Sequence, residues 1–302
     1  MDIVKIYDDY PGRTNFVFTG RKDPYLLAKD DDHLPDEEDD GWFSFPNPEQ
    51  GRIECKSDKD MDENSPPTYN IKKILENQNG ILYKDPDSPN GDFQDIEITW
   101  RVKNVTPKNG DGQKPHLELV AGGFKQANEK TKVGKDKDVI AQCEAMSYHA
   151  NIYPGTGRVK FEKDSRHDHH NEKSGYAKDI QGVEKIDTKL KFDDSKEIVQ
   201  KFILYRIPGN EKWKFFMKLE LWHDETGKGD NFKKVHEFTD KGQWGKTKDG
   251  NGDCCNSDDE YEFVVLWMTR CAVGIRCDNL DDLLFKDWSV RSIDPSKPLH
   301  QG

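Results

Sequence analysis

Residues that can exchange protons or carry positive charge gather in the middle of the chain. Tyr148 and His149 are adjacent, and Arg158 and Lys160 follow them closely. Histidine titrates near neutral pH, tyrosine can donate a proton, and cations stabilise developing negative charge. These residue types predict a catalytic site with His149 and Tyr148 as base and acid and with Arg158 and Lys160 beside a substrate carboxylate.

Two reactions on a polysaccharide use such groups. Elimination from a uronic acid needs a cation or amide at the carboxylate, a base for the C5 proton and an acid for the leaving oxygen. Hydrolysis instead needs two carboxylates about 5 to 9 Å apart. No closely spaced carboxylates of the ExDxxE kind occur in the sequence, so a lyase acting on an acidic, uronate-containing polysaccharide ranks above a hydrolase.

The elements that must position these residues are β-strands. In Ile96–Lys103 the apolar residues occupy alternate positions, which is typical of a half-buried antiparallel strand. Many short strands separated by turn residues predict an all-β antiparallel sandwich of the jelly-roll type, with long acidic loops. Similar segments are His116–Gly122, Gly157–Lys163, Ile198–Ile207, Trp213–His223, Phe232–Phe238, Glu262–Met268, Ala272–Asp278 and Leu284–Ile293.

The strand predicted at Trp213–His223 carries aromatic residues on both faces. Phe216, Lys218, Glu220 and Trp222 share its more polar face. Aromatic rings that stack on sugars beside charged groups that hydrogen-bond them predict a substrate-binding surface. The alternative is a strand whose second face is covered by a loop.

Two segments could bind metal ions. Asp249, Asn251, Asp253 and Glu260 occupy positions 1, 3, 5 and 12 of a twelve-residue loop, as calcium ligands do. Position 6 is Cys254 rather than glycine and no amphipathic helices flank the loop, which excludes an EF-hand but leaves a calcium loop, or a simple acidic turn, open. The histidines near residue 170 predict an exposed loop, with a metal site as the alternative.

Composition restricts the partners. The 302 residues carry a net charge of −12, which argues against a general nucleic-acid or anionic-membrane surface. No apolar run is long enough for a spanning helix. Residues 1–90 are expected to form N-terminal strands and acidic loops packed on a sandwich at 91–302, as one structural domain. The oligomeric state stays open.

The sequence does not decide the cellular compartment of the protein. Met1–Tyr10 lacks the features of a secretory signal, so we expect a soluble protein, with any export requiring a leader that this sequence does not include. The six cysteines show no paired CxxC spacing, which disfavours structural zinc. In an oxidising compartment Cys254 or Cys255 is expected to pair with a distant cysteine such as Cys143.

Several motifs lie between Gly91 and Ile293. They are Tyr148-His149, Gly157-x-Val159-x-Phe161-x-Lys163-Asp164-x-x-His167, Lys218-Leu-Glu-Leu-Trp222 with Asp224-Glu225, Val235-x-Glu237-Phe238-x-Asp240-x-Gly242-x-Trp244-Gly245, Arg276-x-Asp278-Asn279 and Lys286-Asp-x-Ser289-Val290-Arg291. Together they resemble a little-characterised family of concanavalin A-like jelly-roll proteins, which is similar to the jelly-roll polysaccharide lyases. The resemblance implies a saccharide ligand held on a concave sheet, and adds His167 and Arg276 to the residues expected to bind substrate. A lectin-like module without catalysis and a glycoside hydrolase on the same fold remain alternatives.

Overall fold

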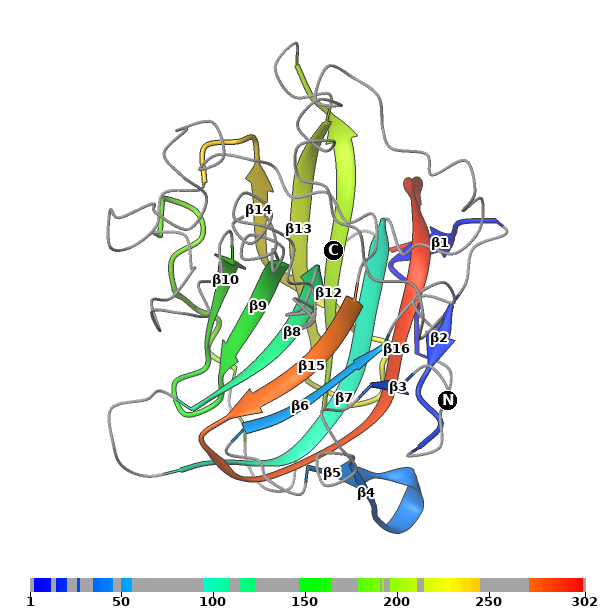
Figure 1. Cartoon of the computed structure of the whole chain (residues 1–302), viewed down its shortest axis with the longest axis vertical. Coiled ribbons are helices and arrows are strands. Elements are labelled where there is room, and N and C mark those ends of the chain that lie inside the picture. The colour runs from blue at the N-terminus through cyan, green and yellow to red at the C-terminus, as the bar shows by residue number, and fades with distance from the viewer. Residues whose placement is uncertain are drawn as a thin grey trace, which may run out of the picture.

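The computed structural model describes residues 3–11, 15–20, 26–27, 35–45, 50–55, 95–108, 115–122, 147–164, 179–190, 192, 196–210, 215–244 and 272–300. Two antiparallel sheets account for most of this part of the chain, and Figure 1 shows them as two layers, with the seven-stranded sheet in front. None of the described residues belongs to a helix long and apolar enough to cross a membrane.

The nine-stranded sheet has the order β14-β13-β12-β7-β16-β5-β4, with β1 and β2 also paired to β16. The long final strand holds this sheet together, because it pairs with β7 along most of its length. The strands are β1 (Tyr7–Asp9), β2 (Phe16–Val17), β4 (Asp36–Glu37), β5 (Phe43–Ser44), β7 (Ile96–Pro107), β12 (Ile198–Pro208), β13 (Phe215–Asp224), β14 (Lys233–Asp240) and β16 (Leu280–Pro298), and a 3₁₀ turn, η2 (Asp39–Gly41), precedes β5.

The seven-stranded sheet has the order β11-β10-β9-β8-β15-β6-β3. The chain passes between the layers repeatedly, since β8 to β10 follow β7, and β15 lies between β14 and β16 in sequence. Such crossings make a jelly-roll-type sandwich rather than two separate meanders. The strands are β3 (Leu26–Leu27), β6 (Gln50–Cys55), β8 (His116–Gly122), β9 (Ser147–Tyr153), β10 (Arg158–Asp164), β11 (Ile186–Asp187) and β15 (Ala272–Asp278).

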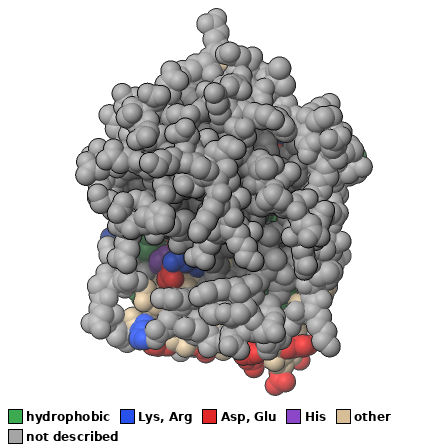
Figure 2. All heavy atoms as spheres, viewed as in Figure 1, with side chains coloured by type: hydrophobic (Ala, Val, Ile, Leu, Met, Phe, Trp, Pro, Cys, Tyr) green, Lys and Arg blue, Asp and Glu red, His purple; other side chains and the backbone are tan. Residues whose placement is uncertain are grey.

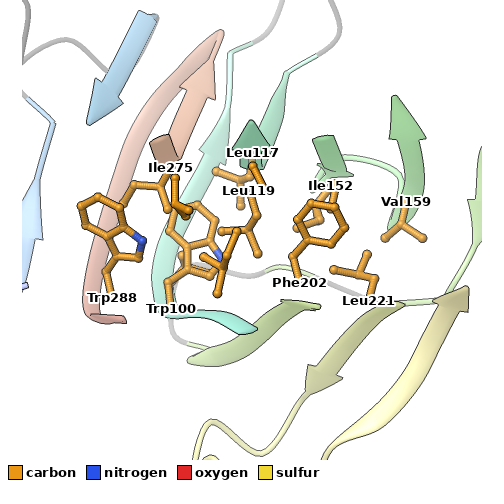
Figure 3. Close-up of a cluster of buried hydrophobic side chains, with 14 of the residues drawn as sticks. Trp100, Leu117, Leu119, Ile152, Val159, Phe202, Leu221, Ile275 and Trp288 are labelled. Atoms are coloured by element: carbon orange, nitrogen blue, oxygen red, sulfur yellow. The ribbon is translucent and has the colours of Figure 1, made fainter. Parts of the chain in front are cut away.

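The main core lies between the sheets. Trp100 and Phe202 come from the nine-stranded sheet and meet Leu119, Ile152 and Ile275 from the other, as Figure 3 shows. All five side chains are fully buried. Burial of such side chains stabilises the fold by about 1.5 to 3 kcal/mol each, so the inward positions decide the register of every strand.

A second, smaller core covers the outer face of the nine-stranded sheet. Ile6 and Tyr7 of the N-terminal segment pack on Val199, Ile203 and Trp222. One face of β12 and β13 therefore contacts the main core, and the other contacts the N-terminal strand.

The predicted all-β antiparallel sandwich is confirmed. Strands predicted at His116–Gly122 and Ala272–Asp278 have the predicted limits, and that at Leu284–Ile293 is part of the longer β16. The pattern missed β9, whose inward residues include a tyrosine and an alanine. The segment at Glu262–Met268 lies outside the described residues.

Candidate functional site on the seven-stranded sheet

Polar side chains occupy the outward positions of four neighbouring strands. The inward residues of β8, β9, β10 and β15 belong to the main core, so their sequence neighbours point outward. Cross-strand pairing aligns the outward residues in rows across β15, β8, β9 and β10. The first row is Asp278, His116, Tyr153 and Arg158, the second is Arg276, Glu118, Asn151 and Lys160, and the third is Gly274, Val120, His149 and Glu162.

These rows make up the polar face, and Figure 2 shows histidine, basic and acidic side chains exposed together on this side of the molecule. A tight turn joins β9 to β10, in which Gly157 has a φ of 66°. The Gly157 carbonyl accepts a hydrogen bond of 2.6 Å from Thr188 Oγ1. The turn therefore holds Arg158 and Lys160 in register with Tyr153 and Asn151.

Glu118 lies at the centre of the polar face and is 1% exposed. Its carboxylate accepts hydrogen bonds from His116 Nε2 at 2.7 Å and His149 Nδ1 at 3.1 Å, and Arg276 approaches to 3.5 Å. Burial favours the neutral acid, but the hydrogen bonds from His116 and His149 outweigh it and hold the pKa of Glu118 well below its usual range. Glu118 is therefore an ionised acceptor.

The ionised Glu118 determines the tautomer of His149. A carboxylate only accepts hydrogen bonds, so His149 Nδ1 carries the proton that faces it. In the neutral form of the ring, Nε2 then accepts a hydrogen bond from Ser147 Oγ, which lies 2.7 Å away. Ser147 and His149 are both buried, at 5% and 4% exposure.

Lys160 and Tyr153 lie farther along the polar face. Lys160 Nζ donates to Glu162 at 2.6 Å and contacts Asp179 at 2.9 Å. Burial opposes the charge of Lys160, but the carboxylates of Glu162 and Asp179 outweigh it and raise the pKa of Lys160. Burial and the charge of Glu162 raise the pKa of Tyr153 to about 12, so its hydroxyl stays protonated at neutral pH.

Asn151 contributes an unsatisfied acceptor to the same face. The residue is 1% exposed, and its Oδ1 has no hydrogen-bond partner among the described residues. A buried acceptor without a partner costs about 1 to 3 kcal/mol, so native proteins rarely keep one without a role. Asn151 lies between Glu118 and Lys160 in the second row.

Three residues of the polar face have the types and spacing of metal ligands. One ligand atom each from His116, Glu118 and Asp278 lies within 4.8 Å of the others. Arg276 already serves as their counter-charge, because its guanidinium lies 2.6 Å from Asp278 and 3.5 Å from Glu118. The same guanidinium bridges the two carboxylates that a hydrolase would need free.

The structure separates Tyr148 from His149, which corrects the predicted acid–base pair. Adjacent residues of a strand point to opposite faces, and Tyr148 points into the main core with no exposed surface. Its hydroxyl donates to Asp240 Oδ2 at 2.7 Å, and the same oxygen accepts from Lys163 Nζ at 2.8 Å. Tyr148 therefore belongs to a buried ion-pair network that connects the two sheets.

The predicted sugar-binding strand faces away from the polar face. Lys218, Glu220 and Trp222 are on the outer side of β13, in the nine-stranded sheet. Trp222 is 3% exposed beneath the N-terminal segment, and its Nε1 donates to Glu220 at 2.9 Å. Phe216 is half-buried at the start of β13. The structure thus matches the alternative of a covered second face and brings none of these residues to His149.

Of the other predicted site residues, His149, Arg158, Lys160 and Arg276 share the polar face. The remaining ones lie outside the described residues, as does the cysteine pair, so the calcium loop stays a prediction. They are His167, Asp249, Asn251, Asp253 and Glu260.

A surface pocket of about 490 Å³ lies elsewhere, beside the nine-stranded sheet, and is lined in part by Arg101, Lys228 and Lys286. Arg101 is already paired there, since its Nε donates to Asp287 at 2.7 Å. This pocket holds no histidine and no proton-transfer pair among its lining residues, so the polar face is the better candidate.

Sequence reasoning missed Ser147, Glu118, Asn151, Tyr153 and Asp278. The segments containing Glu118 and Asp278 were correctly predicted as strands, and the outward alternation of polar residues was visible there. Alternation did not predict the pairing of β8 with β9 and β15, which places residues that are far apart in sequence side by side.

The chain resembles known proteins in structure rather than in sequence. No protein-family model matches it, and no curated protein matches it either. Among solved structures, the carbohydrate-binding module CBM66 from Bacillus subtilis is 11% identical with a TM-score of 0.37, covering 93% of this chain and 98% of that one. Lectin UEA-II complexed with galactose is 10% identical with a TM-score of 0.39, covering 92% and 98%.

A third structure, the κ-carrageenase from Pseudoalteromonas carrageenovora with an oligotetrasaccharide of κ-carrageenan, is 9% identical with a TM-score of 0.33, covering 94% of this chain and 97% of that one. The evidence for function is therefore the geometry of the polar face itself. The predicted resemblance to polysaccharide lyases stays a prediction.

Proposed function

We propose that the polar face binds an acidic saccharide. The observation that carries this proposal is the unsatisfied Asn151 Oδ1, which lies buried between the charged groups of Glu118 and Lys160. A saccharide hydroxyl can donate to the amide oxygen and accept from a neighbouring cation. A polyhydroxylated ligand would thus remove the desolvation cost that the free protein carries at Asn151.

Arg158 supports an acidic rather than a neutral saccharide. It is exposed at the end of the first row, next to Tyr153, and makes no ion pair within the described part of the chain. A planar guanidinium matches a carboxylate with two parallel hydrogen bonds. A uronate placed with its hydroxyls toward Asn151 would have its carboxylate within the reach of a cation on the same face.

The test is binding of uronate oligosaccharides and their carboxyl-reduced counterparts, measured by isothermal titration calorimetry. We expect the uronates to bind and the reduced forms to bind at least about tenfold more weakly, since losing one charge-assisted pair costs about 1.4 kcal/mol or more. Arg158→Gln should reduce uronate affinity by a similar factor. Lys233→Gln is the matched control, because Lys233 is an exposed cation on β14 of the other sheet.

Asn151→Ala provides the second measurement. Asn151→Ala removes the unsatisfied Oδ1 together with the side-chain hydrogen bond to Tyr153, so the melting temperature should change little while saccharide affinity falls. Equal affinities of wild type and Asn151→Ala for every uronate tested would contradict the proposal, as would equal binding of acidic and reduced sugars.

Elimination of the bound uronate is the second candidate function, and Tyr153 is the observation that favours it. Its pKa of about 12 keeps a proton available for the leaving oxygen. The His116 ring lies 5.5 Å from the Tyr153 ring, centroid to centroid, whereas His149 is four residues, about 13 Å, along the same strand. A lyase on this face would use Tyr153 with His116 rather than Tyr148 with His149.

Lyase activity would appear as a rise in ultraviolet absorbance from unsaturated products. Tyr153→Phe should remove that rise and leave uronate binding in place. If wild type binds uronates and produces no absorbance over prolonged incubation, the face binds without elimination.

A further inference from the structure

Ser147, His149 and Glu118 are connected in the order of a charge relay. Ser147 Oγ lies 2.7 Å from His149 Nε2, and His149 Nδ1 lies 3.1 Å from Glu118 Oε2. The serine and glutamate thus contact different nitrogens of one imidazole. This is the arrangement that a hydroxyl nucleophile needs, with a base beside it and a third group orienting the base.

From this geometry we propose that Ser147 is an acyl-transfer nucleophile and that the polar face hydrolyses carboxylic esters. Ser147 and His149 are the catalytic residues. Glu118 is a positioning residue, because it touches His149 and not the ester. The inference does not depend on saccharide binding, since any ester that reaches Ser147 would report it.

The contacts of His149 match the proton positions that such a relay requires. His149 Nδ1 faces the Glu118 carboxylate and Nε2 faces Ser147 Oγ, so a neutral imidazole protonated on Nδ1 presents a bare Nε2 to the serine. The contacts of Glu118 with His116 and Arg276 orient the carboxylate from its other side. A supported carboxylate restricts rotation of the imidazole and stabilises the imidazolium that forms during attack.

The position of Ser147 in the sheet is also suited to a substrate. Ser147 is the first residue of β9, and its cross-strand neighbour on β8 is Gly122, which adds no side chain beside the hydroxyl. Backbone pairing on both sides, to Gly122 and to Asp164, holds the serine in place. The nucleophile is therefore on a rigid element, at the end of a strand.

The reaction balances with water alone. Ser147 Oγ forms a bond to the ester carbonyl carbon and its proton moves to His149 Nε2. The bond from that carbon to the alcohol oxygen breaks, and His149 returns the proton to the departing alkoxide. Water then attacks the acyl-serine with its proton taken by His149, and the carboxylic acid leaves as Ser147 regains a proton.

Covalent labelling with a biotinylated fluorophosphonate tests the nucleophile directly and requires no knowledge of the natural acyl group. We expect one adduct per chain, mapped by peptide mass spectrometry to Ser147. Ser147→Ala should abolish the adduct, and His149→Gln should slow labelling about a hundredfold or more, as loss of a general base does. Ser292→Ala is the control, because Ser292 is a buried serine of β16 whose Oγ has no partner.

Glu118 is tested through turnover of p-nitrophenyl acetate. Glu118→Gln should lower kcat at least about tenfold while KM changes little, and Glu118→Asp should recover part of the loss. Absence of a Ser147 adduct in the folded wild-type protein would overturn the proposal without any variant. Labelling of Ser147 at an unchanged rate in His149→Gln would overturn it equally.

Discussion

The buried pair between Lys163 and Asp240 offers a quantitative test of how the two sheets are joined. Both side chains have no exposed surface, and Lys163 Nζ donates to Asp240 at 2.8 Å and to the Trp244 carbonyl at 2.6 Å. Charges 2.8 Å apart at an effective dielectric constant of 20 attract by about 6 kcal/mol. Burial opposes this attraction and lowers the pKa of Lys163 even with Asp240 beside it.

Lys163→Met should destabilise the fold by about 3 to 5 kcal/mol, because it leaves Asp240 charged and buried without a cation. Within the described part of the chain, Asp240 would keep the Tyr148 hydroxyl at 2.7 Å and the Gly242 amide at 2.9 Å. The double variant Lys163→Met with Asp240→Asn should lose less stability than Lys163→Met alone, since neither member of the buried pair then carries a charge. The double variant should therefore lie within about 2 kcal/mol of wild type.

Urea unfolding followed by tryptophan fluorescence measures these differences, with all variants compared at equal m-value. Asp9→Asn serves as a control for an ion pair at the surface, and is expected to cost about 1 kcal/mol or less. A loss below about 1 kcal/mol for Lys163→Met, or additive losses in the double variant, would refute a charge pair that connects the sheets.

Three further predictions concern the core and the turn. Burial lowers the pKa of His236 to about 4, so between pH 6.5 and 4 the unfolded chain binds a proton that the folded chain does not. The free energy of unfolding should therefore fall by about 3 kcal/mol on acidification over that window, as measured by urea titrations at each pH. His236→Phe, which keeps the stack on Phe161, should make this fall smaller. Gly157→Ala should destabilise the fold by about 2 kcal/mol or more and weaken uronate binding, because its Cβ would lie 2.2 Å from the Leu190 carbonyl oxygen. An unchanged free energy of unfolding would mean that the turn accommodates the methyl group without strain. Tyr148→Phe should lower the free energy of unfolding by about 1.5 to 3 kcal/mol in the same assay and leave saccharide binding and fluorophosphonate labelling unaltered. A specific loss of binding or labelling would show that Tyr148 acts in the site after all.

Much of the fold could be predicted from side-chain alternation. Ile96–Lys103 and Ala272–Asp278 alternate apolar and polar residues, and in both the apolar set faces the main core. β9 was not predicted, because Tyr148 is an amphipathic inward residue and Asn151 and His149 are buried outward ones. When both faces of a strand are buried, polarity no longer distinguishes them.

The candidate site was harder to predict than the fold, for a reason that Tyr148 and His149 illustrate. Proximity in sequence places two residues of one strand on opposite faces, so their adjacency was evidence against a shared site. Arg158 and Lys160, two residues apart, were correctly expected on one face. Glu118 could not be connected to His149, because a separation of thirty-one positions in the sequence does not specify which strands pair.

The chemistry of the polar face depends on that pairing more than on any single residue. Glu118 contacts His149 only because β8 and β9 pair with Val120 opposite His149, which leaves Glu118 one diagonal step away. A slip of one residue between these strands would turn Glu118 toward the core and leave His149 without its carboxylate. The apolar residues Leu117, Leu119 and Ile152 prevent the slip, since it would expose them to solvent. Packing between the sheets therefore decides which carboxylate the imidazole on the outer face contacts.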